Sequence, residues 1–170
     1  MFYKGQYVSC KNKGVCTVED MTKLDISGVD KEKEYYILKP YYSPASTVYI
    51  PAESAESSMR PILTETEAEA LILYMPQIPM LAVQNERFIE QDYKNAMKSN
   101  NCEEWVKLIK TIYDRKQKRL QAGKKETSLD GRYFKQAEEM LYGELAIALN
   151  MQKNEICAYL IKRLKGLQTV

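Results

Sequence analysis

The sequence predicts an α+β protein in which a small all-β domain precedes an all-α domain. Residues 1 to about 62 hold short runs of aromatic and β-branched residues between turn-forming residues, whereas the later residues repeat apolar side chains at helical spacing. Strands and helices do not alternate along the chain, which disfavours a doubly wound parallel sheet. We therefore expect two domains, 1–62 and 63–170.

The first domain shows several strand-like segments in quick succession. The turn signal Asn12-Lys13-Gly14 separates the first two, and Glu34–Lys39 is rich in aromatic and β-branched residues. Ser46–Pro51 is a further expected strand. Short strands at such close spacing indicate a small SH3-like or Tudor-like barrel.

The second domain carries the signals of several amphipathic helices. Thr64 and Glu67 have the spacing of a capping box, and so do Asn101 and Glu104. Helices are expected from about Glu86 to Ser99, from Asn101 to near Gly123, from about Ser128 onward, and from about Met151 to Leu164. Helical spacing predicts that Trp105 packs in the core, and that the last helix places Ile156, Cys157, Leu160, Ile161 and Leu164 together.

The composition disfavours catalysis and metal binding. The chain of 170 residues has four cysteines, no C-x-x-C pair and no histidine. It therefore lacks the commonest general base and the usual zinc ligands, and no phosphate-binding glycine loop is present. We expect a protein that is not an enzyme and that needs no cofactor or metal, with its cysteines serving as small buried apolar residues.

The chain shows neither a signal peptide nor a membrane span. Its longest apolar run, Ala70–Met75, is far shorter than the roughly 20 residues that cross a bilayer. The N-terminus lacks the charged and then apolar pattern of a secretory signal. We therefore expect a cytoplasmic protein that does not contact membranes.

One segment is strongly basic although the net charge of the chain is only +2. Between Trp105 and Lys125 there are eight basic residues and a single acid, Asp114. A clustered positive face of this kind can neutralise DNA phosphates, but it can also be an ordinary solvated helix face.

Two further segments could contact partners. The strand Ser46–Pro51 could lie at an open sheet edge and pair with a strand of another chain, or it could be internal. Phe88 and Ile89 follow Arg87 at the start of a helix, where an apolar side chain can wedge into a minor groove. Ile89 fits the apolar stripe of that helix, so Phe88 is the residue expected to be exposed.

Seven segments together resemble the CarD/CdnL-type RNA polymerase-binding regulators, whose N-terminal domain is similar to that of the transcription-repair coupling factor. They run in order over nearly the whole chain: Phe2–Val8, Lys13–Val15, Tyr35–Lys39, Val48–Glu53, Asp92–Met97, Asp114–Leu120 and Gly143–Ala146. Individually these matches are weak, but jointly they are specific.

The resemblance implies a Tudor-like domain that pairs a strand with the polymerase β subunit. It also implies a helical domain that touches the upstream fork of the promoter bubble and stabilises open complexes. On this basis the expected polymerase contacts are Thr47, Val48, Tyr49, Ile50 and Tyr36. The expected DNA contacts are Arg87, Phe88, Ile89, Lys94, Lys116, Arg119, Lys124 and Lys125.

The chain departs from the family pattern at two places. Family members carry a tryptophan wedge at the position of Ile89, and basic residues where Glu90, Gln91 and Asp92 stand here. The basic residue of the polymerase-pairing strand is replaced by Tyr49, so that contact is expected to be aromatic rather than ionic.

Two functional hypotheses follow. The first is a monomeric bacterial transcription regulator that binds the polymerase β subunit and, weakly and without reading sequence, promoter DNA. The alternative is a Tudor-like protein-interaction adaptor without direct DNA contact. An enzyme ranks last, because no pairing of a nucleophile with a base is visible.

Overall fold

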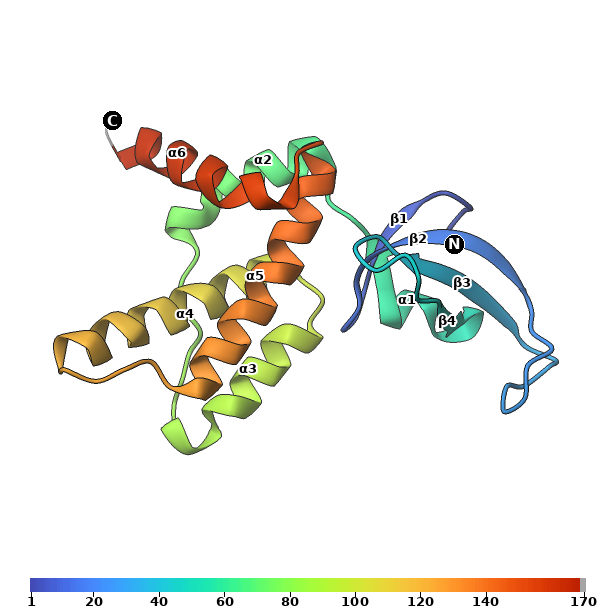
Figure 1. The fold of residues 1–170 in the computed structure, drawn as a ribbon, viewed down its shortest axis with the longest axis horizontal. Coiled ribbons are helices and arrows are strands. Elements are labelled where there is room, and N and C mark those ends of the chain that lie inside the picture. The colour runs from blue at the N-terminus through green and yellow to red at the C-terminus, as the bar shows by residue number, and fades with distance from the viewer. Residues whose placement is uncertain (169–170) are drawn as a thin grey trace. The chain divides into compact units, whose positions relative to one another are not determined.

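A computed structural model describes residues 1–168, in which the chain forms two compact units (Figure 1). Met1–Ile62 form the N-terminal unit, and Leu63–Val170 form the helical unit. The N-terminal unit is an antiparallel sheet and the helical unit contains no strand among its described residues, so the predicted α+β class with the β part first is confirmed.

The N-terminal unit is built around one five-stranded antiparallel sheet with the strand order β4-β3-β2-β1-β5. The 3-10 turn Ala52–Ser54 and the single-turn helix α1 (Ala55–Ser58) connect its last two strands in sequence. The strands are β1 (Tyr7–Cys10), β2 (Gly14–Lys23), β3 (Glu34–Pro40), β4 (Val48–Pro51) and β5 (Met59–Pro61). The expected strand Ser46–Pro51 is thus two residues shorter, because Ser46 and Thr47 belong to the preceding loop.

Alternate side chains of the strands form the core of this unit, as the pleat of a sheet requires. Val8, Val18 and Leu38 are fully enclosed there. Cys10 and Cys16 are buried free thiols in the same cluster, which confirms the expectation that they act as small apolar residues.

The helical unit contains five helices longer than one turn among its described residues. The 3-10 turns Met75–Gln77, Glu86–Phe88 and Lys153–Glu155 join or introduce some of them. The helices are α2 (Glu65–Tyr74), α3 (Ile89–Lys98), α4 (Cys102–Gln121), α5 (Ser128–Ala148) and α6 (Ile156–Gln168). None of the helices within residues 1–168 combines the length and the apolar character that crossing a membrane requires.

Side-chain caps fix where α2 and α4 begin. The hydroxyl of Thr64 accepts from the Glu67 amide at 3.1 Å while the Glu67 carboxylate accepts from the Thr64 amide at 2.8 Å, so the predicted capping box is confirmed. Asn101 caps α4 by accepting from the amide of Glu103 at 2.8 Å. Glu104 does not complete a second box, because its carboxylate binds Lys107 instead.

Two apolar clusters hold the helices together. Trp105 is completely buried in the first, as predicted, beside Ile72 and Leu145. In α6, Ile156 and Leu160 are buried, but Cys157 and Ile161 are exposed, because each lies one residue and therefore about 100° further around the helix. The expectation that the cysteines are buried is therefore wrong for Cys157.

A buried carboxylate joins three helices at one end of the helical unit. Asp130, near the start of α5, is fully enclosed and accepts hydrogen bonds from the Tyr93 hydroxyl at 2.8 Å and from Arg115 Nε at 3.0 Å. Tyr93 belongs to α3 and Arg115 to α4, so this carboxylate links α3, α4 and α5 in addition to the apolar cluster that these helices share. Burial is the main cause that raises the pKa of Tyr93, followed by its hydrogen bond to Asp130, which keeps the hydroxyl a donor at neutral pH.

We predict that Asp130→Ala lowers the free energy of unfolding by about 3–5 kcal/mol, because it leaves the Arg115 charge without its buried partner. Urea denaturation followed by circular dichroism measures this change. The matched control is Asp114→Ala, which breaks the exposed pair with Lys118 and is expected to cost about 0.5 kcal/mol or less. Equal losses in the two variants would contradict the role assigned to Asp130.

Candidate functional site

The strand β4 lies at an open edge of the sheet. Among the described strands its one neighbour is β3, with Tyr49 opposite Ile37 and Ile50 opposite Tyr36. The other side of β4 therefore presents backbone groups that no strand within residues 1–168 uses. Such an edge is a template for a strand from a partner, and the alternative of an internal strand is excluded.

The side chains of β4 point to opposite faces of the sheet, as strand geometry requires. Val48 and Ile50 pack against the core of the N-terminal unit. Tyr49 faces outward with 42% of its surface exposed. Thr47, expected within the strand, is an exposed residue of the preceding loop. Of the expected contacts in this segment, Tyr49 is thus the large side chain that a partner strand can reach.

The expected contact through Tyr36 requires a correction. Its side chain is only 4% exposed and lies in the core, because residue 36 of β3 points to the inner face of the sheet. Its hydroxyl accepts a hydrogen bond from the amide of Phe2 at 3.2 Å, and the two rings meet edge to face. Tyr36 therefore supports Ile50 from the neighbouring strand and offers no surface to a partner.

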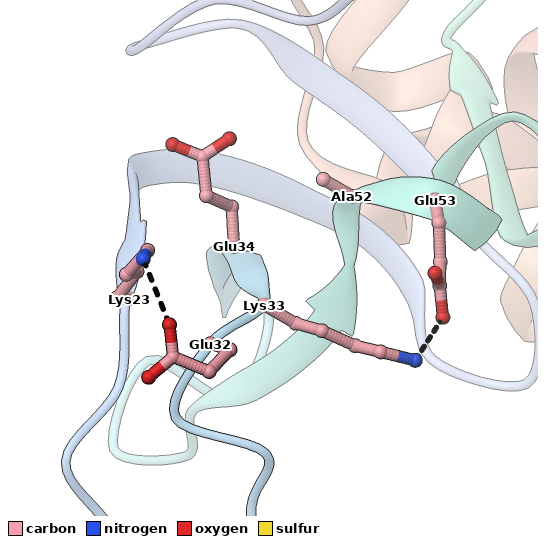
Figure 2. Close-up of a pocket in the computed structure, with 6 residues that line it drawn as sticks. All are labelled: Lys23, Glu32, Lys33, Glu34, Ala52 and Glu53. Carbon is pink, nitrogen blue, oxygen red and sulfur yellow. Dashed lines mark hydrogen bonds and ion pairs between the residues drawn. The ribbon is translucent and has the colours of Figure 1, made fainter.

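A charged depression of about 360 Å³ lies at the end of the β3–β4 ladder (Figure 2). Figure 2 shows the ammonium of Lys33 directed at the carboxylate of Glu53, 2.7 Å away, with Lys23 and Glu32 forming a second pair at 3.5 Å. The hydrogen bond to Glu53 raises the pKa of Lys33. Because these charges largely compensate one another, the depression is better suited to matching charges on a partner than to catalysis.

The start of α3 places an aromatic ring in solvent. Asn85 accepts from the amide of Arg87 at 3.0 Å and so begins the 3-10 turn that precedes this helix. Phe88 is 64% exposed, whereas Ile89 is 6% exposed and packs beside Tyr93. The expected orientation of both residues is confirmed. Ile89 must be removed from the set of direct DNA contacts, because its side chain belongs to the core.

The segment between Trp105 and Lys125, which we call the basic segment, carries less unpaired positive charge in the folded chain than its sequence suggests. Acids and carbonyls, both within the segment and outside it, bind most of its cations. The ammonium of Lys110 donates to the carbonyls of Met75 and Ile78, and Arg115 binds Asp130 and Glu86. The remaining ion pairs are Lys107 with Glu104, Lys116 with Glu126, and Lys118 with Asp114.

Two lysines retain free charge beyond the end of α4. Lys124 and Lys125 are exposed in the loop before α5, and no partner for either ammonium occurs within residues 1–168. Arg119 shapes this loop, since its Nε donates to the carbonyl of Lys125 at 2.7 Å. Lys94 on α3 is also exposed but is paired with Glu90 at 3.7 Å.

These residues share one end of the helical unit. Arg115 of α4 binds Glu86, in the turn before α3, at 2.6 Å and Asp130, near the start of α5, at 3.0 Å. The exposed Arg87 and Phe88 therefore lie at the same end of the unit as Lys124 and Lys125. We call this end of the unit, with these four residues, the basic end.

Sequence reasoning missed one cation here. Arg132, in the second turn of α5, has a side chain 59% exposed and stacks over the ring of Tyr133 at 5.4 Å. It also reaches Glu90 at 3.4 Å. Arg132 lies outside the basic segment in sequence, and the fold brings it beside α3.

The described residues include no cluster of three or more histidine, cysteine or acidic side chains that could hold a metal ion.

Comparison with known families identifies the unit that carries the β4 edge. Residues 2–63 match the family model of the CarD-like/TRCF RID domain. The N-terminal unit is a CarD-like RNA polymerase-interacting domain. The match spans almost all of this RID domain and ends where the helical unit begins. A search of curated proteins found no match to the chain.

Proposed function

We propose that this chain is a cytoplasmic bacterial transcription regulator of the CarD/CdnL type. In this proposal its RID domain pairs β4 with a strand of the RNA polymerase β subunit. The helical unit contacts promoter DNA near the upstream edge of the bubble and modulates the stability of the open complex. The protein acts as a monomer and without catalysis. The observation that carries the proposal is an open strand edge in a domain of the polymerase-interacting class.

Strand addition explains how so small a domain can hold a large partner. Backbone hydrogen bonds along the β4 edge supply affinity, while the outward side chain supplies selectivity. Tyr49 is a large amphipathic side chain of the kind that dominates protein interfaces. Val48 and Ile50 keep the strand fixed to the core, so little order has to be gained when the partner binds.

We predict that Tyr49→Ala weakens binding of the full-length chain to RNA polymerase by about tenfold, the size of loss expected for a central interface aromatic. Biolayer interferometry with immobilised polymerase measures the dissociation constant. Tyr3→Ala is the matched control, because Tyr3 is 69% exposed and lies outside the sheet. Unchanged affinity of the Tyr49→Ala variant would refute the β4 contact.

The contact with DNA is proposed to be weak and electrostatic. The free charges of Lys124 and Lys125 can neutralise phosphates, and phosphate contacts give affinity without sequence information. The paired lysines of α4 contribute less, because their acids already neutralise them. Lys116 and Arg119 act mainly by holding the loop, through Glu126 and the carbonyl of Lys125.

We predict that replacing Lys124 and Lys125 with glutamine lowers the slope of log affinity against log salt concentration by about 1–2, since each phosphate contact contributes roughly 0.9. Fluorescence anisotropy with labelled promoter DNA at a series of salt concentrations gives the slope. Lys107→Gln combined with Lys118→Gln removes the same formal charge from paired positions and should leave the slope nearly unchanged. A larger effect from this second pair would place the DNA contact elsewhere.

Phe88 is the proposed wedge of this protein. A wedge has to be apolar, exposed and held rigidly at the DNA, because unstacking a base step costs a few kcal/mol. Phe88 meets these requirements at the basic end next to Arg87, whereas Ile89 is enclosed. Its ring lacks the indole N–H donor of the family tryptophan, so the wedge is expected to be weaker.

We predict that Phe88→Ala shortens the lifetime of open complexes while leaving the free energy of unfolding within about 0.5 kcal/mol, as for an exposed residue. Ile89→Ala should instead destabilise the fold by about 2–4 kcal/mol, because it opens a cavity in the core. Competitor-challenged open complexes and urea denaturation provide the two measurements. A wild-type lifetime in the folded Phe88→Ala variant would argue against a wedge.

A second candidate function is a protein-interaction adaptor that binds polymerase without touching DNA. The pairing of most cations on α4 favours it, because those cations are already bound to acids of the same chain. Titrating labelled promoter DNA with the chain, with and without polymerase, separates the two functions. DNA affinity at background level in both titrations would support the adaptor.

A further inference from the structure

Three tyrosines lie together on the sheet of the N-terminal unit, outside its core. The rings of Tyr7 and Tyr41 meet edge to face with their centroids 5.8 Å apart, and the rings of Tyr41 and Tyr42 do so at 4.9 Å. Tyr7, Tyr41 and Tyr42 are 39%, 46% and 42% exposed. Edge-to-face contact uses the face of only one ring in each pair, so the cluster still offers ring surface to a further planar partner.

The register of the strands places this cluster on the outer face of the sheet. Tyr7 of β1 lies opposite Thr17 of β2, and Thr17 lies opposite Lys39 of β3, so the three side chains form one row. The amide of Tyr41 donates to the carbonyl of Val15 at 2.9 Å, which continues the ladder by two residues on the same face. Intervening residues of all three strands belong to the core. Tyr7, Tyr41 and Lys39 therefore point away from the core.

Unpaired lysines border the tyrosine cluster. Lys11 and Lys13 are exposed in the turn that joins β1 to β2, which ends just before Val15, the residue that pairs with Tyr41. Lys39 is partly exposed on the face itself. Among the residues that the structure describes, none of these three ammonium groups forms an ion pair. By contrast, the lysines near the opposite ends of β2 and β3 are paired with glutamates.

The acidic residues of the N-terminal unit lie elsewhere. All of them fall within residues 19–34 and 53–56, whereas residues 1–18 and 35–52, which supply the cluster and its lysines, contain none. The unit is thus divided in charge along β2 and β3, with the acids toward the end that holds the charged depression (Figure 2). A positive face without an opposing carboxylate attracts anions.

We propose that this face binds a single-stranded nucleic acid, with bases stacked on the tyrosine rings and phosphates beside the lysines. Proteins that bind single strands combine cations along the backbone with aromatic side chains on which the bases stack. No residue of this face belongs to β4 or to the basic end, so the proposal does not depend on the polymerase contact or on the contact with promoter duplex. The side chains that we call the tyrosine–lysine face are Tyr7, Tyr41, Tyr42, Lys11, Lys13 and Lys39.

A single strand uses both components of the tyrosine–lysine face. A duplex keeps its bases stacked inside and presents mainly phosphates to a sheet surface. An acidic peptide would meet the lysines but would leave the exposed rings without planar partners, and a proline-rich peptide would meet the rings but not the lysines. Each nucleotide of a single strand instead supplies one base plane and one negative charge, which matches rings and ammonium groups that lie side by side.

The test uses the full-length chain with Lys124→Gln and Lys125→Gln as background, so that the basic end contributes little to binding. Fluorescence anisotropy compares a labelled oligothymidine of about 12 nucleotides, which lies within the roughly 4–16 nucleotides that one small single-strand-binding domain covers, with a duplex of the same length and with a polyglutamate peptide of the same charge as the oligothymidine. In a second measurement, an oligothymidine that contains 5-iodouracil is irradiated, and mass spectrometry identifies the side chain to which it crosslinks.

We expect the oligothymidine to bind more tightly than the duplex or the peptide and to crosslink to a tyrosine of the face. Tyr7→Ala and Tyr42→Ala should each weaken its binding at least about fivefold, because each removes a stacking ring, and should leave duplex affinity unchanged. Tyr7→Phe should retain the affinity, since the ring remains. Tyr74→Ala is the matched control, because Tyr74 is 50% exposed at the end of α2 in the other unit.

The salt dependence tests the lysines. Replacing Lys11 and Lys13 with glutamine should lower the slope of log oligothymidine affinity against log salt concentration by about 1–1.5, since each phosphate contact on a single strand contributes roughly 0.7. Lys23→Gln combined with Lys33→Gln removes the same formal charge from paired positions of the same unit and should leave the slope nearly unchanged.

Four results would overturn the proposal. The first is oligothymidine affinity that neither Tyr7→Ala nor Tyr42→Ala changes in a folded chain. The second is crosslinking confined to residues outside the face. The third is an equal fall in salt slope in the two double-lysine variants. The fourth is a polyglutamate peptide that binds at least as tightly as the oligothymidine, which would assign the face to an acidic protein segment.

Discussion

The hydrogen-bonded ion pair between Asp130 and Arg115 is the constraint on which the arrangement of the basic end depends. A buried carboxylate is tolerated only when its oxygens are satisfied, and here Tyr93 and Arg115 satisfy them from two other helices. The same guanidinium reaches Glu86 at the start of the turn that presents Phe88. The turn that carries the exposed ring is therefore tied to α4 and α5 through Arg115.

The distribution of unpaired positive charge around α4 depends on ion pairs formed in the fold rather than on composition alone. Acidic side chains pair with most of the cations on α4. The ammonium of Lys110 instead donates hydrogen bonds to backbone carbonyls. The positive charge that remains is concentrated where α4 ends. On the proposed function, a weak and localised charge would add phosphate contacts after polymerase has bound, without strong binding to duplex DNA in general.

The features of the fold that could be predicted are those that depend on residues close together in the sequence. The cap at Thr64, the burial of Trp105 and the opposite orientations of Phe88 and Ile89 all follow from spacing within a turn or two. The pairing of Arg115 with Asp130 could not be predicted, because its two partners come together only when α4 packs on α5. The exposure of Cys157 and Ile161 on α6 escaped prediction for a related reason, since spacing alone does not tell which apolar residues find a neighbour.

The open edge of β4 also carries a hazard, because an unpaired strand can add to another copy of itself as readily as to a partner. Here the strand is only four residues long and ends in Pro51, which has no amide hydrogen to donate. A ladder between two such edges would hold few hydrogen bonds. In the proposed contact with polymerase, the same shortness would limit the number of ladder hydrogen bonds and so favour reversible docking.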